Sequence, residues 1–160
     1  MNLIYSGDEW RATKVSANQK YSLDEITFFL EKKYVNLRFY MIIKDAENHI
    51  DIAPLTQVNS TNASYYNFQC SATIPVKAKD GLCSISLIGF DTSTNKITFT
   101  TPAYEVSLDN LVYNFKAQIS MLEDFNKNGA DLYNKMLALY QGMVKLSELN
   151  VDMVKDVEVS

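Results

Sequence analysis

His49 is the first residue to consider for chemistry, because it is the only histidine in the chain. Asp45, Glu47 and Asp51 surround it in a polar turn, and closely spaced acidic residues are typical of a calcium-binding loop. However, no glycine follows at the required sharp turn, and no glutamate closes a loop of the required length. No cysteine lies near His49 in sequence to share a zinc ion with it. We therefore interpret His49 as a surface turn residue and expect no metal and no other cofactor.

The two cysteines, Cys70 and Cys83, fall on neighbouring predicted strands. We expect two buried thiols, with a disulfide as the alternative, and a cysteine nucleophile would need His49, which is distant in sequence. Trp10 and Tyr5 could stack on a sugar, but a single tryptophan in a β-domain more often serves the core or an interface. The chain also lacks the G-x-S-x-G, P-loop and G-x-G-x-x-G motifs, so the sequence predicts a protein that is not an enzyme.

Composition narrows the class of protein further. The chain has 160 residues, of which 47% are hydrophobic and 12% aromatic, enough for a real core with a preference for β-structure. Its net charge of −4 gives no basic face for a nucleic-acid partner. The first residues lack the pattern of a signal peptide, and no apolar run is long enough to span a membrane. We expect folding in a cytoplasm, without a membrane or nucleic-acid partner.

The middle of the chain reads as a series of short strands separated by turns. Apolar residues alternate or run together in residues 35–44, 50–55, 65–74, 82–90, 96–101 and 103–108, with the second strand ended by Pro54. No gap between them is long enough for a helix, which indicates an antiparallel sheet. We predict an immunoglobulin-like antiparallel β-sandwich over residues 1–107. Residues 22–33 are ambiguous, because Ser22 and Glu25 form a capping-box pattern while Ile26, Phe28 and Leu30 alternate like a strand.

After Leu108 the spacing of apolar residues changes to that of a helix. Asp109 can cap it, and a heptad pattern then continues through residue 157, which predicts a helical coiled coil over residues 108–160. Unbroken, the helix from Phe115 would be a rod of roughly 65 Å. The residues predicted to mediate oligomerisation are the a and d positions Phe115, Leu122, Phe125, Leu132, Met136, Leu139, Met143, Leu146, Asn150, Met153 and Val157.

Two features leave alternatives open for this helix. Asn128 and Gly129 form a strong turn signal, so the chain could fold there into a helical hairpin, although the heptad phase continues across it. The e positions include Ile119 and Tyr133, and this broad apolar face favours a homotrimer over a dimer. The apolar stripe could instead pack on the β-domain of its own chain, chiefly through Leu111 and Phe115.

A small β-domain that leads directly into a trimerising helix resembles the N-terminal domain of phage baseplate upper proteins. The residues that carry the resemblance are LRFYMIIKDAENHIDI, then NFQCSATIPVKAKDGLCSISLIGFDTSTNKITFTTPAYEVSL, then the helix from Asp109. The resemblance implies a protein that anchors a receptor-binding protein to the tail tip, without catalytic residues. That family continues past the helix into a further domain, whereas this sequence stops at Ser160, so we expect a truncated form or a shorter fibre or adaptor protein.

These observations lead to one expected function and two alternatives. We expect a structural virion component of a phage tail baseplate or fibre, whose β-domain docks on the particle and whose helix trimerises. Its partners would be copies of itself and other phage structural proteins, with a receptor-binding protein as one candidate. The first alternative is a carbohydrate- or protein-binding β-sandwich that uses Trp10 and the tyrosine-rich strands. The second is a bacterial adaptor whose helix fits a groove on its partner.

Overall fold

The computed structural model describes residues 1–34, 36–60 and 62–126, together with residues 134, 137, 138 and 141. Strands dominate the described residues, so the prediction of a mainly β protein is confirmed. The elements in chain order are β1 (Asn2–Ser6), β2 (Glu9–Thr13), the 3-10 helix η1 (Leu23–Glu25), β3 (Thr27–Glu31), β4 (Leu37–Lys44), β5 (Ile50–Val58), β6 (Tyr65–Cys70), β7 (Gly81–Asp91), β8 (Lys96–Thr100), β9 (Tyr104–Leu108) and α1 (Asn110–Asn126).

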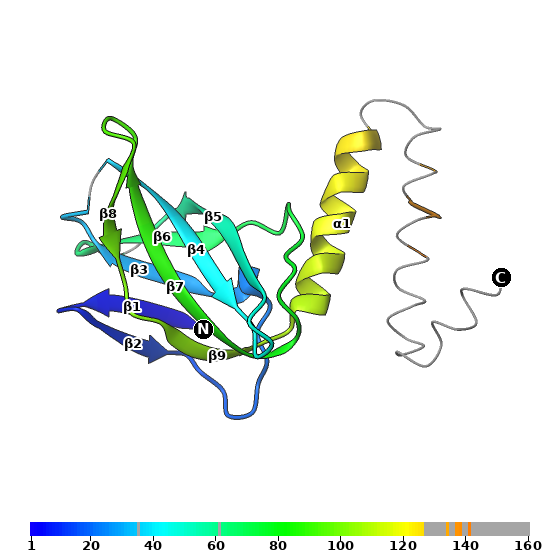
Figure 1. Cartoon of the computed structure of the whole chain (residues 1–160), viewed down its shortest axis with the longest axis horizontal. Coiled ribbons are helices and arrows are strands. Elements are labelled where there is room, and N and C mark those ends of the chain that lie inside the picture. The colour runs from blue at the N-terminus through cyan, green and yellow to red at the C-terminus, as the bar shows by residue number, and fades with distance from the viewer. Residues whose placement is uncertain (35, 61, 127–133, 135–136, 139–140, 142–160) are drawn as a thin grey trace.

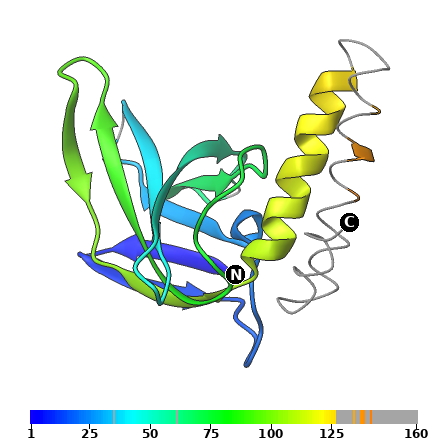
Figure 2. The same ribbon diagram turned by 45° about the vertical axis from the view of Figure 1, so that its right-hand side comes forward.

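The strands form one continuous curled sheet (Figures 1 and 2) in the order β2-β1-β3-β6-β5-β4-β7-β8, with β9 also paired to β7. The predicted immunoglobulin-like sandwich would instead divide the strands between two separate sheets. All strand pairs are antiparallel except β1 and β3, which run parallel. The sheet closes on itself partly through Tyr21, whose backbone pairs with β9 next to the start of α1.

The core lies inside the curl and is built from alternate residues of the strands. On β7 the inward residues are Cys83, Ile85, Leu87 and Gly89, as the alternation in the sequence predicts. Aromatic rings bring the two halves of the sheet together. The Phe39 ring on β4 lies 4.8 Å from that of Phe68 on β6, centroid to centroid.

The prediction that Pro54 ends its strand is wrong, because β5 continues to Val58. The strand changes partners at this residue. It pairs with β4 up to Pro54 and with β6 from Leu55 onward. Proline lacks a backbone N–H and is usually excluded from strand interiors. Here it stands at the switch between two partner strands, and β5 thereby joins the two halves of the sheet.

The first 34 residues contain both structures suggested by the ambiguous segment. Ser22 donates its backbone N–H to Glu25 Oε1 at 2.8 Å, as a capping box requires, and η1 is followed directly by β3. The β1–β2 hairpin before it was not predicted. Its turn at Gly7 and Asp8 has positive φ values of 59° and 61°, the backbone conformation of a tight hairpin turn.

Helix α1 begins at Asn110, where the sequence predicts a helix after Asp109. The Val112 N–H donates to Asp109 Oδ1 at 3.1 Å, which confirms the expected cap. The helix leads away from one end of the curled sheet, beside the end of β9 (Figures 1 and 2). Among the described residues, no helix is long and apolar enough to cross a membrane.

Candidate interaction surfaces

The start of α1 is fixed to the loop between β6 and β7 by polar contacts. The side-chain amide of Asn110, which is buried, donates to the carbonyl oxygens of Ala78 at 2.9 Å and Lys79 at 3.1 Å. The Leu111 N–H donates to Asp80 Oδ1 at 2.8 Å. These contacts satisfy loop carbonyls and one of the free N–H groups of the first helical turn. They therefore set the direction in which the helix leaves the sheet.

One turn later, Tyr113 and Asn114 attach the same side of α1 to the end of β6 and to the following loop. The Tyr113 hydroxyl donates to the Ser71 carbonyl at 3.1 Å and lies 3.3 Å from Cys70 Sγ. Burial raises the pKa of both Tyr113 and Cys70. The Asn114 side chain accepts from the Val76 N–H at 2.8 Å and donates to the Val76 carbonyl at 3.0 Å. This side of the helix is thus part of the folded core.

A different side of α1 carries exposed apolar side chains. Leu111, Val112 and Ile119 are 43%, 40% and 40% exposed, and we call these three residues the outward helix stripe. In the heptad phase they occupy d and e positions, whereas the buried Tyr113 occupies an f position. The helix is therefore apolar on more than one side, whereas an ordinary surface helix has a single apolar stripe that faces the core.

The predicted oligomerisation residues are described only at the start of the helix. Phe115 is half-buried. Leu122 is only 4% exposed in the single chain, so it has little surface left for a contact between copies. The side chain of Phe125 and the residues Leu132, Met136, Leu139, Met143, Leu146, Asn150, Met153 and Val157 lie outside the described part of the structure, as do Asn128 and Gly129. The role of this stripe in oligomerisation stays a prediction.

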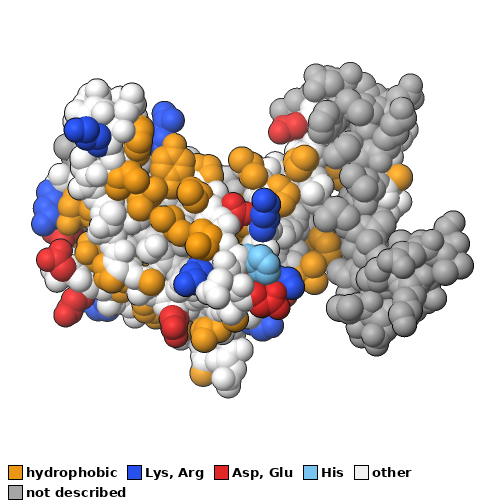
Figure 3. Space-filling model, viewed as in Figure 1, with side chains coloured by type: hydrophobic (Ala, Val, Ile, Leu, Met, Phe, Trp, Pro, Cys, Tyr) orange, Lys and Arg blue, Asp and Glu red, His pale blue; other side chains and the backbone are white. Residues whose placement is uncertain are grey.

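A second apolar surface covers the outward side of strands β4, β5, β7 and β8. We call it the outer apolar face. On β4, whose inward residues fill the core, the outward Tyr40 and Ile42 are only half-buried, and on β5 Ile52 is 55% exposed. Figure 3 shows hydrophobic side chains gathered over β7 and β4 on the side toward the viewer. The residues of this face are Tyr40, Ile42, Ile50, Ile52, Pro54, Ile88, Phe90 and Ile97.

Strand pairing makes these residues neighbours. Tyr40 pairs with Pro54 on one side and with Ile88 on the other, and Ile42 pairs with Ile52. Residues directly opposite each other on paired strands have their side chains in contact range. A contiguous exposed apolar surface of this kind marks an interaction site more often than scattered apolar residues do. The sequence indicates the outer apolar face only through the apolar end of the strand predicted at residues 35–44.

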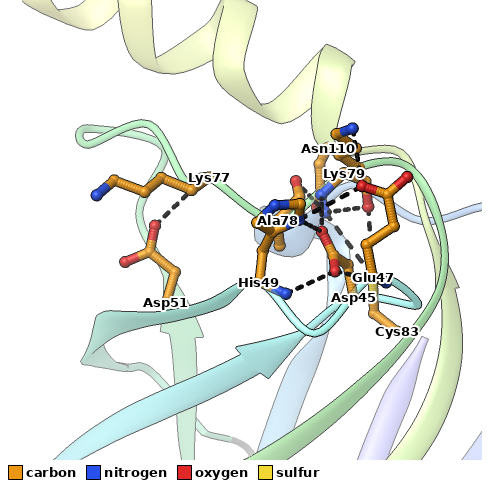
Figure 4. A network of polar contacts seen from close by, with 9 residues as sticks. All are labelled: Asp45, Glu47, His49, Asp51, Lys77, Ala78, Lys79, Cys83 and Asn110. Carbon is orange, nitrogen blue, oxygen red and sulfur yellow. Dashed lines mark hydrogen bonds and ion pairs between the residues drawn. The ribbon is translucent and has the colours of Figure 1, made fainter.

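The acidic turn around His49 forms a structural network (Figure 4). Asp45 is buried, and its carboxylate accepts from the backbone N–H groups of Glu47, His49 and Lys79 at 2.8–2.9 Å. It also lies 2.8 Å from His49 Nδ1. Burial alone would raise the pKa of Asp45, but these hydrogen bonds outweigh it and hold that pKa well below its usual range.

The other acidic residues of this turn have partners of their own, and Glu47 Oε2 also lies 3.7 Å from His49 Nδ1. Asp51 accepts from the Lys77 N–H at 2.7 Å, and Glu47 forms an ion pair with Lys79 at 2.8 Å. Among the residues that the structure describes, no cluster of three or more histidine, cysteine, aspartate or glutamate side chains could hold a metal ion. The network joins the β4–β5 turn to the β6–β7 loop, and the Asn110 side chain joins that same loop to α1.

The two cysteines and Trp10, which the sequence offers as candidates for chemistry, lie in the core or pack against it. Cys70 and Cys83 are buried free thiols, as predicted. Cys70 Sγ lies 3.3 Å from the Tyr113 hydroxyl, whereas Cys83 Sγ contacts the Lys79 carbonyl at 3.5 Å. Trp10 donates its indole N–H to the Pro102 carbonyl at 2.8 Å, and its ring lies 5.0 Å from that of Tyr5. This tryptophan thus ties β2 to the segment between β8 and β9.

Comparison with known proteins gives no family for this chain. No protein-family model matches the sequence, and no curated protein matches it either.

Proposed function

We propose that this protein is a non-enzymatic structural subunit of a protein assembly. In this proposal α1 begins a helical segment that associates with its copies as a trimeric coiled coil, and the β-domain docks on a neighbouring protein. The observation that carries the proposal is the outward helix stripe of Leu111, Val112 and Ile119. Because the other side of α1 is fixed to its own domain, this stripe keeps a defined direction and can meet a second chain.

The outer apolar face supports the docking half of the proposal. It lies on the middle strands of the sheet, and β4 is paired on both sides, by β5 and β7. A partner would therefore rest on the face of the sheet instead of adding a strand to an edge. Arg38 and Lys44 are exposed at the two ends of β4 and would give this contact a positive rim.

The resemblance to phage baseplate upper proteins extends the proposal to a virion. The assembly would then be a tail baseplate or fibre, in which the β-domain attaches to the particle and three helices form the stalk. The partners would be other phage structural proteins, such as a receptor-binding protein. The sheet architecture and the junction of β9 with α1 at Leu108 and Asn110 fit this layout, although they are not specific to phage proteins.

The test is light scattering of the purified full-length chain with matched point variants. A truncation after Leu108 is a poor test, because it removes Tyr113 from the core. We compare Ile119→Glu, combined with Val112→Glu, against Ile97→Glu on the outer apolar face. Ile97 is 55% exposed and lies on β8, so the control introduces a glutamate at an exposed isoleucine of the sheet instead of the helix.

We expect the wild type and Ile97→Glu to have three times the mass of the 18.2 kDa chain. The double variant at Val112 and Ile119 should be monomeric or dissociate at much higher concentration, because carboxylates would be buried in the contact. A wild-type chain that stays monomeric at concentrations of about 0.1 mM would refute self-association, since a Kd above that value is weak for a stable oligomer.

A further inference from the structure

Two adjoining cavities lie at the end of the curled sheet opposite α1. The larger has a volume of about 500 Å³ and the smaller about 300 Å³, and both are lined by Gln57 and Tyr66. Tyr66 stands at the start of β6, whereas Cys70, at the other end of that strand, contacts Tyr113 of α1. We call the two cavities together the tyrosine groove. Mouths of curled or closed sheets are common positions for ligand sites.

The smaller cavity is largely polar at its surface and lies over aromatic rings of the core. Phe39 and Phe68 are 2% and 7% exposed, and their rings meet edge to face. Tyr34 lines the same cavity, and its ring lies 4.4 Å from that of Phe99 in the core. Because Phe39 and Phe68 are almost fully buried, a ligand would contact chiefly the half-buried rings of Tyr34 and Tyr66, which the core beneath them holds in place.

The larger cavity is, like the smaller one, lined mostly by polar groups. Beside Tyr66 it is lined by Tyr65, by Gln57 and by residues of the β5–β6 loop such as Asn59. In the described part of the chain, no hydrogen bond to another residue is made by the side-chain amides of Gln57 and Asn59 or by the hydroxyls of Tyr65 and Tyr66. These groups can both donate and accept, so they remain available to a ligand.

The charge of the groove is small and positive. Lys32 lines the larger cavity, and its Nζ lies over the Tyr66 ring, 5.1 Å from the centroid. No aspartate or glutamate is among the residues that line the two cavities. Lys33 Nζ lies 5.2 Å from the centroid of the Tyr34 ring, which lines the smaller cavity. A neutral ligand, or one that carries a few carboxylates, would therefore be accepted.

We propose that the tyrosine groove binds an oligosaccharide. A sugar ring presents C–H groups on its faces, which pack on aromatic rings, and hydroxyls around its edge, which pair with amides and tyrosine hydroxyls. A purely apolar ligand would leave the amides of the larger cavity unpaired, which is unfavourable. A saccharide uses both parts of the groove, and a uronic acid would place its carboxylate near Lys32. This site is independent of self-association, since it lies at the opposite end of the sheet from α1.

The experiment is isothermal titration of the full-length chain with three probes. These are a neutral maltohexaose, an oligogalacturonate that carries carboxylates, and a proline-rich peptide, which is another ligand that aromatic grooves bind. The test variant is Tyr66→Ala, and Tyr40→Ala is the matched control, because Tyr40 is also a half-buried tyrosine on a strand but belongs to the outer apolar face. Lys32→Gln tests the charged part of the groove.

We expect at least one saccharide to bind with a Kd of about 1 mM or lower. Tyr66→Ala should weaken that binding by about tenfold or more, because it removes the ring shared by both cavities, and Tyr40→Ala should leave it unchanged. If the oligogalacturonate binds, Lys32→Gln should weaken its binding more than that of maltohexaose. Binding of the peptide alone, absence of saccharide binding, or equal loss in both tyrosine variants would overturn the proposal.

Discussion

Replacement of Tyr113 tests the conclusion that α1 belongs to the folded core. This residue is 1% exposed and is among the largest fully buried side chains. Tyr113→Phe removes only the hydroxyl, which donates to the Ser71 carbonyl at 3.1 Å, so we expect a loss of about 0.5–1.5 kcal/mol in the free energy of unfolding. Tyr113→Ala also leaves a cavity the size of a ring, which typically costs about 3–5 kcal/mol. Such a loss is a large fraction of the total stability of a domain, which is about 5–15 kcal/mol.

The assay is urea unfolding followed by the fluorescence of Trp10, the only tryptophan in the chain. Trp10 lies on β2 and does not contact α1 through any described hydrogen bond or ring pair, so it reports on the whole sheet. Ser120→Ala, on the same helix and only half-buried, is the control and should change the free energy by less than about 0.5 kcal/mol. A loss below about 1 kcal/mol in Tyr113→Ala would mean that α1 packs on the sheet without stabilising it, and the reasoning would be refuted.

Three further predictions concern the core and the turn network. Asp45→Asn should be less stable than wild type at pH 7, and the difference should shrink as the pH falls below 3.8. The folded state holds the pKa of Asp45 below its usual value, so its hydrogen bonds stabilise the fold only while the carboxyl is ionised. A difference that is constant down to about pH 2 would contradict this. Gly89→Ala should destabilise by about 1–3 kcal/mol, measured by urea unfolding, because its Cβ would lie 2.9 Å from that of Phe99; an unchanged midpoint would refute the crowding. Cys70 and Cys83 should react with a thiol reagent only after unfolding, since burial raises the pKa of both, and rapid reaction of the native protein would show that they are accessible.

The sequence predicts well those features that depend only on residues close together in the chain. The alternation of Cys83, Ile85 and Leu87 on β7 predicts the inward side chains because a strand with one buried face must alternate. The cap at Asp109 is likewise a local signal, since its oxygen pairs with an N–H only three residues later. The turn at residues 45–49 was also predicted.

Features that depend on distant residues could not be predicted in this way. Asp45 accepts from the N–H of Lys79, 34 residues later, so only the folded chain reveals why this carboxylate is buried. Pro54 breaks a strand by local rules, but here it falls where β5 changes partners, which is a property of the sheet. The parallel pairing of β1 with β3 also joins segments separated by a long connection.

The heptad pattern shows most clearly why periodicity alone is insufficient. It assumes that a helix buries one face, and it therefore assigned Tyr113 to an outward position. In the structure Tyr113 and Asn114 face the sheet while Leu111, Val112 and Ile119 are exposed. An amphipathic stripe can thus be real and still not be the side on which a helix packs at its beginning.

The three surfaces described for this protein are physically separate, which makes their functions separable. The outward helix stripe lies beyond β9, the outer apolar face lies on the middle of β4, and the tyrosine groove lies at the start of β6. Substitutions at distant sites without shared partners act almost independently on stability. A change at Ile119 should therefore alter assembly without altering saccharide binding, and a change at Tyr66 should do the reverse. If one substitution abolished both, we would test for loss of the fold, which the fluorescence of Trp10 detects directly.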